Sequence, residues 1–194
     1  MTSPWLGIVG VLAVLGGLAG ALKLLERLIS PHPELLRKTL HVGMGLVVIS
    51  FPWIFDEQWP VLLLASLSAA VLVVVKYVPQ LRDGVGSVFM AVQRPSLGEV
   101  CFPVAVASLI VLSRGDKLLF AVPMLIMTLA DAVAALVGVA YGRIRYLTSD
   151  GLKSAEGSIA FFTIAFFSVH VPPLLFTDVG RVETLLIATV IGLL

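Results

Sequence analysis

The residues best suited to chemistry lie within residues 129–158. Asp131 falls inside an apolar stretch of membrane-spanning character, where a carboxylate costs about 2.5 to 3.5 kcal/mol and is retained mainly for function. On a helix, Ala135, Gly138 and Gly142 follow Asp131 on the same face at i+4, i+7 and i+11. Their small side chains leave space beside the acid, which predicts a partner for it there.

The segment after this helix supplies cations, hydroxyl groups and a second acid: Arg143, Arg145, Lys153, Ser154, Glu156 and Ser158. Phosphoryl transfer needs cations against a polyphosphate, carboxylates that hold Mg²⁺, and nearby backbone N–H groups. Asp131 and Glu156 carry the oxygen ligands that Mg²⁺ prefers, and Lys153 can neutralise phosphate oxygens. Gly157 and Ser158 open the next helix, whose N-terminus favours anions. The segment therefore predicts a magnesium-dependent phosphoryl-transfer site.

Each of these residues also has a purely structural interpretation. Gly138-x-x-x-Gly142 is a small-residue motif of the kind that packs membrane helices together. Lys153 can be an interfacial anchor whose ammonium group reaches the headgroups. Ser154 or Ser158 can be the N-cap of the following helix, alone or in addition to a binding role.

The composition indicates an integral membrane protein of all-α, polytopic class. Hydrophobic residues make up 59% of the 194 residues, charged residues 13%, and the mean hydropathy is +1.06. A backbone in hydrocarbon must satisfy its own hydrogen bonds, which favours helices. Runs of spanning or nearly spanning length occur at Trp5–Leu22, Leu40–Phe55, Trp59–Val75, Val100–Ser113, Leu118–Tyr141 and Ser158–Phe176. We expect these six helices and a seventh.

The seventh run, Thr184–Leu194, is too short to span, so we expect a truncated segment or a half-span packed against its neighbours. Residues 1–194 are expected to form one membrane domain, because no connection is long enough to fold alone. Cys101 is the single cysteine and is expected to be a packing residue. The net charge of +1 gives no indication of nucleic-acid binding.

The basic residues predict the orientation of the chain, since Lys and Arg accumulate in cytoplasmic loops. Ten of the thirteen follow the first, third and fifth runs: Lys23, Arg27, Arg37, Lys38, Lys76, Arg82, Arg94, Arg143, Arg145 and Lys153. The opposite connections hold Arg114, Lys117 and Arg181, together with the acidic pair Asp56 and Glu57. We therefore expect the N-terminus outside and the active site facing the cytoplasm.

The pattern D-x-x-A-x-x-x-G-x-x-x-G followed by K-S-x-E-G-S resembles the nucleotide-binding signature of the polyprenol kinase group. That group comprises dolichol kinases, phytol and farnesol kinases, and CTP-dependent diacylglycerol kinases. Here the pattern is formed by Asp131, Ala134, Gly138, Gly142, Lys153, Ser154, Glu156, Gly157 and Ser158. A second element, Arg37-Lys38-x-x-His41, resembles one of phytol kinase-like members, and Gly98-Glu99 with Pro103 is a weaker third. The small core points to the phytol kinase branch.

The resemblance implies transfer of the γ-phosphate of CTP, or of UTP, to the hydroxyl of a membrane isoprenoid alcohol such as phytol. It also implies a multi-pass protein of a bacterial-type inner membrane or a thylakoid membrane. The catalytic residues would be Asp131, Lys153 and His41, and the metal ligands Asp131 and Glu156. The nucleotide would contact Gly138, Gly142, Arg143, Lys153, Ser154, Glu156, Gly157, Ser158, Arg37 and Lys38.

Several of these roles have alternatives. Asp131 can hold Mg²⁺ or accept the alcohol proton, and His41, at i+4 from Arg37, can contact phosphate, act as base, or be a buried structural histidine. Arg37 and Lys38 can be simple interfacial anchors. Two other histidines, His32 and His170, are expected to be structural, and Arg94 and Glu99 can bind nucleotide or pair with each other.

Two other functions fit parts of the pattern. A cytidylyltransferase that makes a CDP-lipid also brings CTP and Mg²⁺ to a polytopic core, but it reacts at the α-phosphate and releases pyrophosphate. A membrane transporter would use Asp131 as an ion site, but it predicts paired broken helices in two halves, and the sequence shows no convincing repeat.

Overall fold

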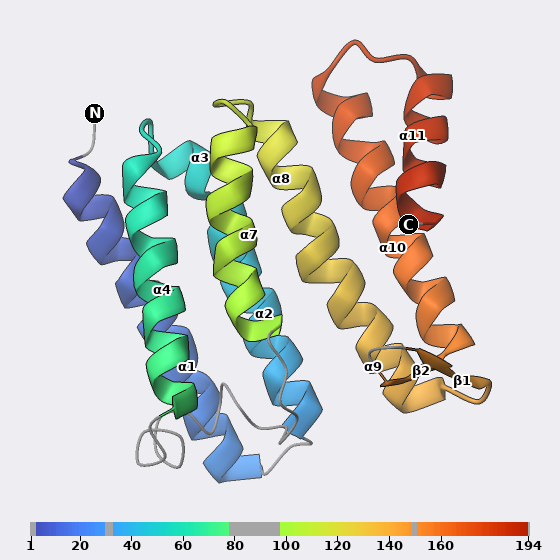
Figure 1. Cartoon of the computed structure of the whole chain (residues 1–194), viewed down its shortest axis with the longest axis horizontal. Coiled ribbons are helices and arrows are strands. Elements are labelled where there is room, and N and C mark those ends of the chain that lie inside the picture. Colours follow the sequence, from blue (N-terminus) through green and yellow to red (C-terminus); the bar gives the residue numbers. More distant parts are fainter. Residues whose placement is uncertain (1–2, 30–32, 78–97, 149–150, 194) are drawn as a thin grey trace. The chain divides into compact units, whose positions relative to one another are not determined.

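The computed structural model of the chain describes residues 3–29, 33–77, 98–148 and 151–193 (Figure 1). These residues are mainly helical, which confirms the predicted all-α, polytopic class. Three helical stretches are long and apolar enough to cross a membrane, Pro4–Ile29, Lys117–Tyr141 and Ala155–Phe176. Shorter apolar helices occupy Trp59–Val75 and Val100–Leu112. The chain divides into two compact units, residues 1–120 and 121–194, and the expectation of one membrane domain stays a prediction.

The first unit is built from α1 (Pro4–Ile29), α2 (Pro33–Ile49), α3 (Phe51–Ile54), α4 (Trp59–Tyr77), α7 (Gly98–Leu112) and the start of α8 (Lys117–Leu125). Helix α1 packs against α2 and α4, and α4 packs against α7. Leu22, Leu36 and Leu40 form a buried cluster between α1 and α2. Gly43 lets the two helices approach closely, since a Cβ atom there would lie 2.5 Å from Cδ2 of Leu18.

Aromatic residues gather at one end of this unit. The rings of Trp5 and Trp59, at the starts of α1 and α4, lie 5.5 Å apart between centroids. The ammonium group of Lys117 lies 5.5 Å from the centroid of the Trp53 ring. Because tryptophan prefers the membrane–water boundary, this end of the unit is suited to an interface.

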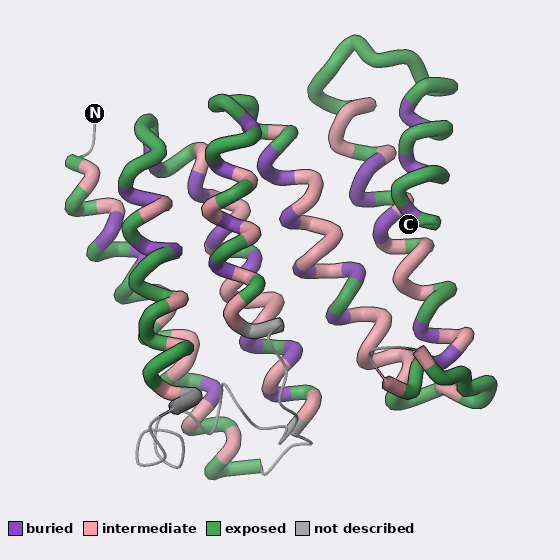
Figure 2. Tube along the Cα trace, viewed as in Figure 1, coloured by how far each residue is buried: buried purple, intermediate pink, exposed green. Residues whose placement is uncertain are grey.

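The second unit contains the end of α8, the π-helix η1 (Ile126–Ala130), α9 (Asp131–Tyr141), strands β1 (Arg145–Thr148) and β2 (Gly151–Ser154), α10 (Ala155–Phe176) and α11 (Arg181–Leu193). Helix α10 packs against α9, η1 and α11. Exposed and buried residues alternate along α10 and α11 (Figure 2), and many of the exposed ones are large and apolar, as lipid-facing residues are.

Helices α2, α10 and α11 begin earlier than predicted, because polar residues before the apolar run are also helical. Helix α2 begins at Pro33 instead of Leu40, because proline at a helix start and Glu34 in the first turn both favour that end. Arg37, Lys38 and His41 are therefore all helical. Helix α10 begins at Ala155 instead of Ser158, and the last helix begins at Arg181 instead of Thr184.

Two elements of the second unit were not predicted. The antiparallel β1–β2 hairpin pairs Arg145 with Ser154 and Tyr146 with Lys153, followed outward by Leu147 with Leu152. The π-helix directly precedes Asp131, whose backbone N–H donates to the carbonyl of Ile126. The second feature changes the path of the helix just before the predicted catalytic acid.

Candidate functional site

The connection between α9 and α10 is fastened by Glu156. Its Oε1 accepts hydrogen bonds from the backbone N–H groups of Arg143, at 3.1 Å, and Ile144, at 3.3 Å. The N–H of Ala155 donates in turn to the carbonyl of Ile144 at 2.9 Å. Oε2 of Glu156 is buried and has no hydrogen-bond partner among the described residues. Glu156 therefore orders the start of the connection and has a second carboxylate oxygen that none of the described residues satisfies.

Ser154 is the N-cap of α10. Its backbone is extended, its side chain is buried, and its Oγ accepts a hydrogen bond from the N–H of Gly157 at 3.1 Å. This confirms the structural interpretation for Ser154. Ser158 has a different contact, because its Oγ shares a short hydrogen bond with the hydroxyl of Tyr146. The N–H groups of Ala155 and Gly157, which an anion at this helix end would use, are thus already bonded within the protein.

The glycines of the motif surround the Ser154 side chain. A Cβ atom on Gly142 would lie 2.9 Å from Cβ of Ser154, and one on Gly138 would lie 3.1 Å from its Oγ. A Cβ atom on Gly157 would lie 2.8 Å from the carbonyl oxygen of Ala134. These residues therefore allow α9 and the start of α10 to approach at a distance that larger side chains would prevent. The small residues have a packing role, and their contact with nucleotide stays a prediction.

The hairpin presents the predicted cations to solvent. Arg143, Arg145 and Lys153 are all exposed, and Lys153 lies opposite Tyr146 in the ladder. Because Tyr146 is bonded to Ser158 in the first turns of α10, this part of the hairpin is held against the helix. Sequence reasoning missed Tyr146, although Asp150-Gly151 between two short alternating segments is a known hairpin signal.

Asp131 is the first residue of α9 and is exposed. The preceding π-helix contains Thr128, which is fully buried and whose Oγ1 has no hydrogen-bond partner in the described part of the chain. Single π-turns within α-helices are frequent at functional sites. Pro123, which cannot donate a backbone hydrogen bond, lies one turn earlier and is the sequence signal for this irregularity.

Asp131 and Glu156 are not brought together. The ten residue steps from Asp131 to Tyr141 advance about 15 Å along α9, and the Glu156 carboxylate is bonded beyond that far end. Mg²⁺ binds its oxygen ligands at about 2.1 Å, so one ion does not reach both carboxylates in this arrangement. The described residues contain no group of three or more His, Cys, Asp or Glu positioned to hold a metal ion.

Arg37, Lys38 and His41 belong to the first unit. The guanidinium of Arg37 forms a bidentate ion pair with Glu34, with distances of 2.7 Å from Nη2 to Oε1 and 3.1 Å from Nε to Oε2. Lys38 is buried, with 4% of its surface exposed, which is rare for lysine. The ring of His41 packs edge-on against Phe102 of α7, with centroids 5.2 Å apart.

The remaining candidates divide by position. Gly98 and Glu99 begin α7, and Pro103 lies within that helix. Arg94 and His32 fall outside the described residues. His170 of α10 stacks on Phe166, and its Nδ1 is buried without a partner among the residues described. Cys101 is exposed, so its predicted packing role is wrong for the chain alone.

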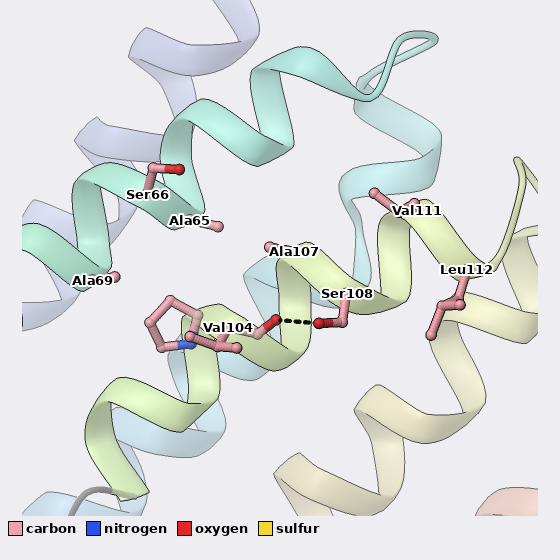
Figure 3. Close-up of a pocket in the computed structure, with 9 residues that line it drawn as sticks. Ala65, Ser66, Ala69, Val104, Ala107, Ser108, Val111 and Leu112 are labelled. Carbon is pink, nitrogen blue, oxygen red and sulfur yellow. Dashed lines mark hydrogen bonds between the residues drawn. The ribbon is translucent and has the colours of Figure 1, made fainter.

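An open groove of about 560 Å³ lies between α4 and α7 in the first unit (Figure 3). Small and apolar side chains line it, and the hydroxyl of Ser108 donates to the carbonyl of Val104 in its own helix. Pro103, from the weaker third element, lines the groove, whereas none of the residues predicted to be catalytic, to contact nucleotide or to hold metal does so. Without charged groups it is unsuited to phosphate.

The chain is similar to a curated protein over nearly its whole length. It is 30% identical to the phytol kinase of Synechocystis sp. over 191 residues, which cover 97% of this chain and 79% of the relative. No protein-family model matches the chain. No solved structure matches it either.

Proposed function

The chain belongs to the phytol kinase family, and we propose that it transfers the γ-phosphate of a nucleoside triphosphate to the hydroxyl of a membrane isoprenoid alcohol such as phytol. The similarity over 97% of the chain is the observation that carries this proposal. CTP is the proposed donor, with UTP as the nearest substitute. The apolar helices agree with a substrate whose tail lies in hydrocarbon and whose hydroxyl lies near the headgroups.

The polyphosphate is proposed to bind along the connection between α9 and α10. Three exposed cations, Arg143, Arg145 and Lys153, lie on this connection. The bonds of Glu156 and the cap formed by Ser154 hold the two ends of this connection at α9 and α10. Preorganised cations stabilise charge on a transferring phosphoryl group without further reorganisation, and Lys153 is assigned this catalytic role.

The residues of this unit can bind a divalent ion through one carboxylate, either that of Asp131 or that of Glu156, but not through both. Mg²⁺ is usually held by one or two carboxylates together with the phosphates of its substrate. Asp131 offers an exposed carboxylate, and Oε2 of Glu156 offers a separate oxygen without a partner among the described residues. When bound, the ion would neutralise charge on the phosphate oxygens.

Activation of the alcohol requires a group that accepts its proton. Asp131 and His41 are the proposed candidates, since a carboxylate and an imidazole both act as general bases. The π-helix before Asp131 and the buried Lys38 one turn before His41 support functional roles for these two positions.

The site is proposed to face the cytoplasm with the N-terminus outside, in a bacterial-type inner membrane or a thylakoid membrane. Ten of the thirteen Lys and Arg residues fall in the connections assigned to the cytoplasmic side. The first unit has its tryptophans, Trp5, Trp53 and Trp59, at the end away from these basic residues, where Asp56 and Glu57 join α3 to α4. The bias of the basic residues is typical of a helix bundle inserted in that orientation, and the tryptophans suit the other end to a membrane–water boundary.

Radiolabelled nucleotides test the reaction. Purified protein in detergent is incubated with phytol, geranylgeraniol or farnesol, with Mg²⁺, and with CTP, UTP or ATP labelled at either the α- or the γ-phosphate. We expect γ-label in the lipid fraction and α-label in the released nucleoside diphosphate. Entry of α-label into lipid with release of pyrophosphate would instead identify a cytidylyltransferase, and no labelled lipid with any alcohol would reject a kinase.

A further inference from the structure

The β1–β2 hairpin carries an apolar pair that the protein does not cover. Leu147 and Leu152 are directly opposite each other in the ladder, with 82% and 54% of their surfaces exposed. Neighbouring pairs in a ladder point to opposite faces, so Tyr146 and Lys153 lie on the other face. The hairpin is thus a two-sided ribbon, with leucines on one side and a lysine and a tyrosine on the other.

The position of the hairpin in the chain fixes its neighbourhood. It lies within residues 142–154, which join the two apolar candidate spans Lys117–Tyr141 and Ala155–Phe176 (Figure 1). A short connection between two spanning helices cannot leave the membrane surface. Tyr141 and Ile144, at the entrance to the connection, are 72% and 68% exposed, so the lipid-facing surface of α9 continues towards the hairpin.

The hairpin is also fastened to α10. The N–H of Ala155 donates to the carbonyl of Ile144, and Tyr146 bonds to Ser158. Within the hairpin itself, the hydroxyl of Thr148 donates to the carbonyl of Gly151 at 2.8 Å. These bonds hold the leucine pair in a set orientation. Exposure of this apolar pair to water is unfavourable in free energy, whereas its burial at the boundary between headgroups and acyl chains is favourable.

We propose that the leucine pair is inserted into the headgroup–acyl boundary of an anionic leaflet, with Arg145, which shares the leucine face of the ladder, contacting lipid phosphates. Arginine side chains beside apolar residues place their stems in the boundary and their charge at the headgroups. Insertion of one face turns the opposite face, with Lys153, towards water. The bilayer surface is therefore the occupant of the leucine face and sets the orientation of the ribbon.

Depth-sensitive labelling tests this proposal without any need for catalysis. In a Cys101→Ser background, single cysteines replace Leu147, Leu152 or, as the matched position on the opposite face, Lys153. Each is labelled with an environment-sensitive fluorophore, and the protein is reconstituted into vesicles of phosphatidylglycerol and phosphatidylcholine. We expect labels at positions 147 and 152 to be quenched by lipids brominated near the headgroups, and to be at least threefold less sensitive to aqueous iodide than the label at 153.

Equal iodide quenching at the three positions would overturn the proposal. Protection of the leucine positions from iodide that depends on protein concentration, without quenching by brominated lipid, would also overturn the proposal. That result would indicate that a second copy of the protein covers the leucines. A companion variant, Leu147→Ser with Leu152→Ser, is expected to keep its helical circular dichroism. A fluorophore attached at Ile144→Cys should report a difference between anionic and neutral vesicles in the protein with both leucines, and this difference should disappear in the double-serine variant. Failure of kinase activity in the wild-type protein leaves both readouts unchanged, so the two proposals are tested separately.

Discussion

Oε1 of Glu156 lies 3.1 Å from the backbone nitrogen of Arg143, thirteen residues earlier in the chain. This bond, with the one to Ile144, joins the end of α9 to the first turn of α10. The same carboxylate keeps Oε2 buried and without a partner among the described residues. One side chain thus has a structural oxygen and an oxygen available for a ligand, and substitutions can separate the two roles.

Glu156→Gln is expected to preserve the fold, because its amide oxygen can accept the same two N–H groups, and to lower kcat at least tenfold through loss of the charge. Glu156→Ala removes the acceptor of both N–H groups and should therefore also lower the melting temperature of the protein. Thermal unfolding in detergent and the γ-phosphate assay measure the two effects. Glu183→Gln, at an exposed position of α11, is the matched control and should change neither. Full activity of Glu156→Gln would limit this residue to ordering the loop.

Gly142→Ala is expected to destabilise the protein by about 1 to 3 kcal/mol, the usual cost of overpacking. The new Cβ atom would clash with the carbonyl oxygen of Gly138 at the end of α9 and would lie 2.9 Å from Cβ of Ser154, so this helix end and the start of α10 must shift. Gly16→Ala in α1 is the control, since nothing lies within 4 Å of a Cβ atom there. Helix propensity makes that change neutral or stabilising by about 0.5 to 1 kcal/mol. Equal melting temperatures for the two variants would contradict the close approach of α9 and α10.

Asp131→Asn is expected to reduce kcat at least a hundredfold while the protein still inserts and unfolds at the wild-type temperature. The amide has nearly the same shape as the carboxylate, but it binds Mg²⁺ weakly and is not a base. The measurement is the γ-phosphate assay across a Mg²⁺ titration. Asp178→Asn, in the exposed connection before α11, provides the control. A metal ligand predicts partial recovery at high Mg²⁺, whereas a proton acceptor predicts none; wild-type turnover excludes both.

Lys153→Met is expected to raise the KM for nucleotide about tenfold or more and to lower kcat, because a cation facing a polyphosphate is lost. A tenfold change corresponds to about 1.4 kcal/mol of interaction. The methionine keeps a long apolar stem, so packing against the ribbon is retained. Arg181→Met removes an exposed cation at the start of α11 and should leave both constants unchanged. An unchanged KM in the lysine variant would return Lys153 to the role of an interfacial anchor.

The helices could be predicted because the bilayer restricts the choices of the backbone. Apolar runs of the required length had to be helical, and apart from their end residues six of the seven predicted runs each follow one continuous helical stretch. The run Leu40–Phe55 was wrong as a single helix, because the chain breaks at Ser50 into α2 and the short α3, which has proline in its first turn. The ends were less predictable. The polar turn that contains Glu34 extends α2 beyond its apolar run, and the cap at Ser154 advances the start of α10. Such ends depend on local bonds that hydropathy does not measure.

The site was predictable in its residues but not in its geometry. Both helix packing and phosphate binding require small residues, so Gly138 and Gly142 alone could not distinguish them; the short distances to Ser154 assign the packing role. The separation of Asp131 from Glu156 depends on where α10 begins relative to the end of α9. The Glu156 bonds that fix this position join residues that are twelve and thirteen positions apart in the sequence, so local patterns do not reveal them. The π-helix had a local signal in Pro123, one turn earlier, but its packing against α10 depends on contacts between segments distant in sequence.

The glycine contacts around Ser154 also limit how this unit moves. Atoms already at van der Waals distance leave no clearance for α9 to slide along α10, so the two helices and the ribbon between them must travel as a single rigid arm. The π-turn that follows Pro123 packs against α10 as well, so it is part of the same arm. Asp131 follows that turn directly, which means that the acid and the ribbon keep a fixed separation whenever the arm moves.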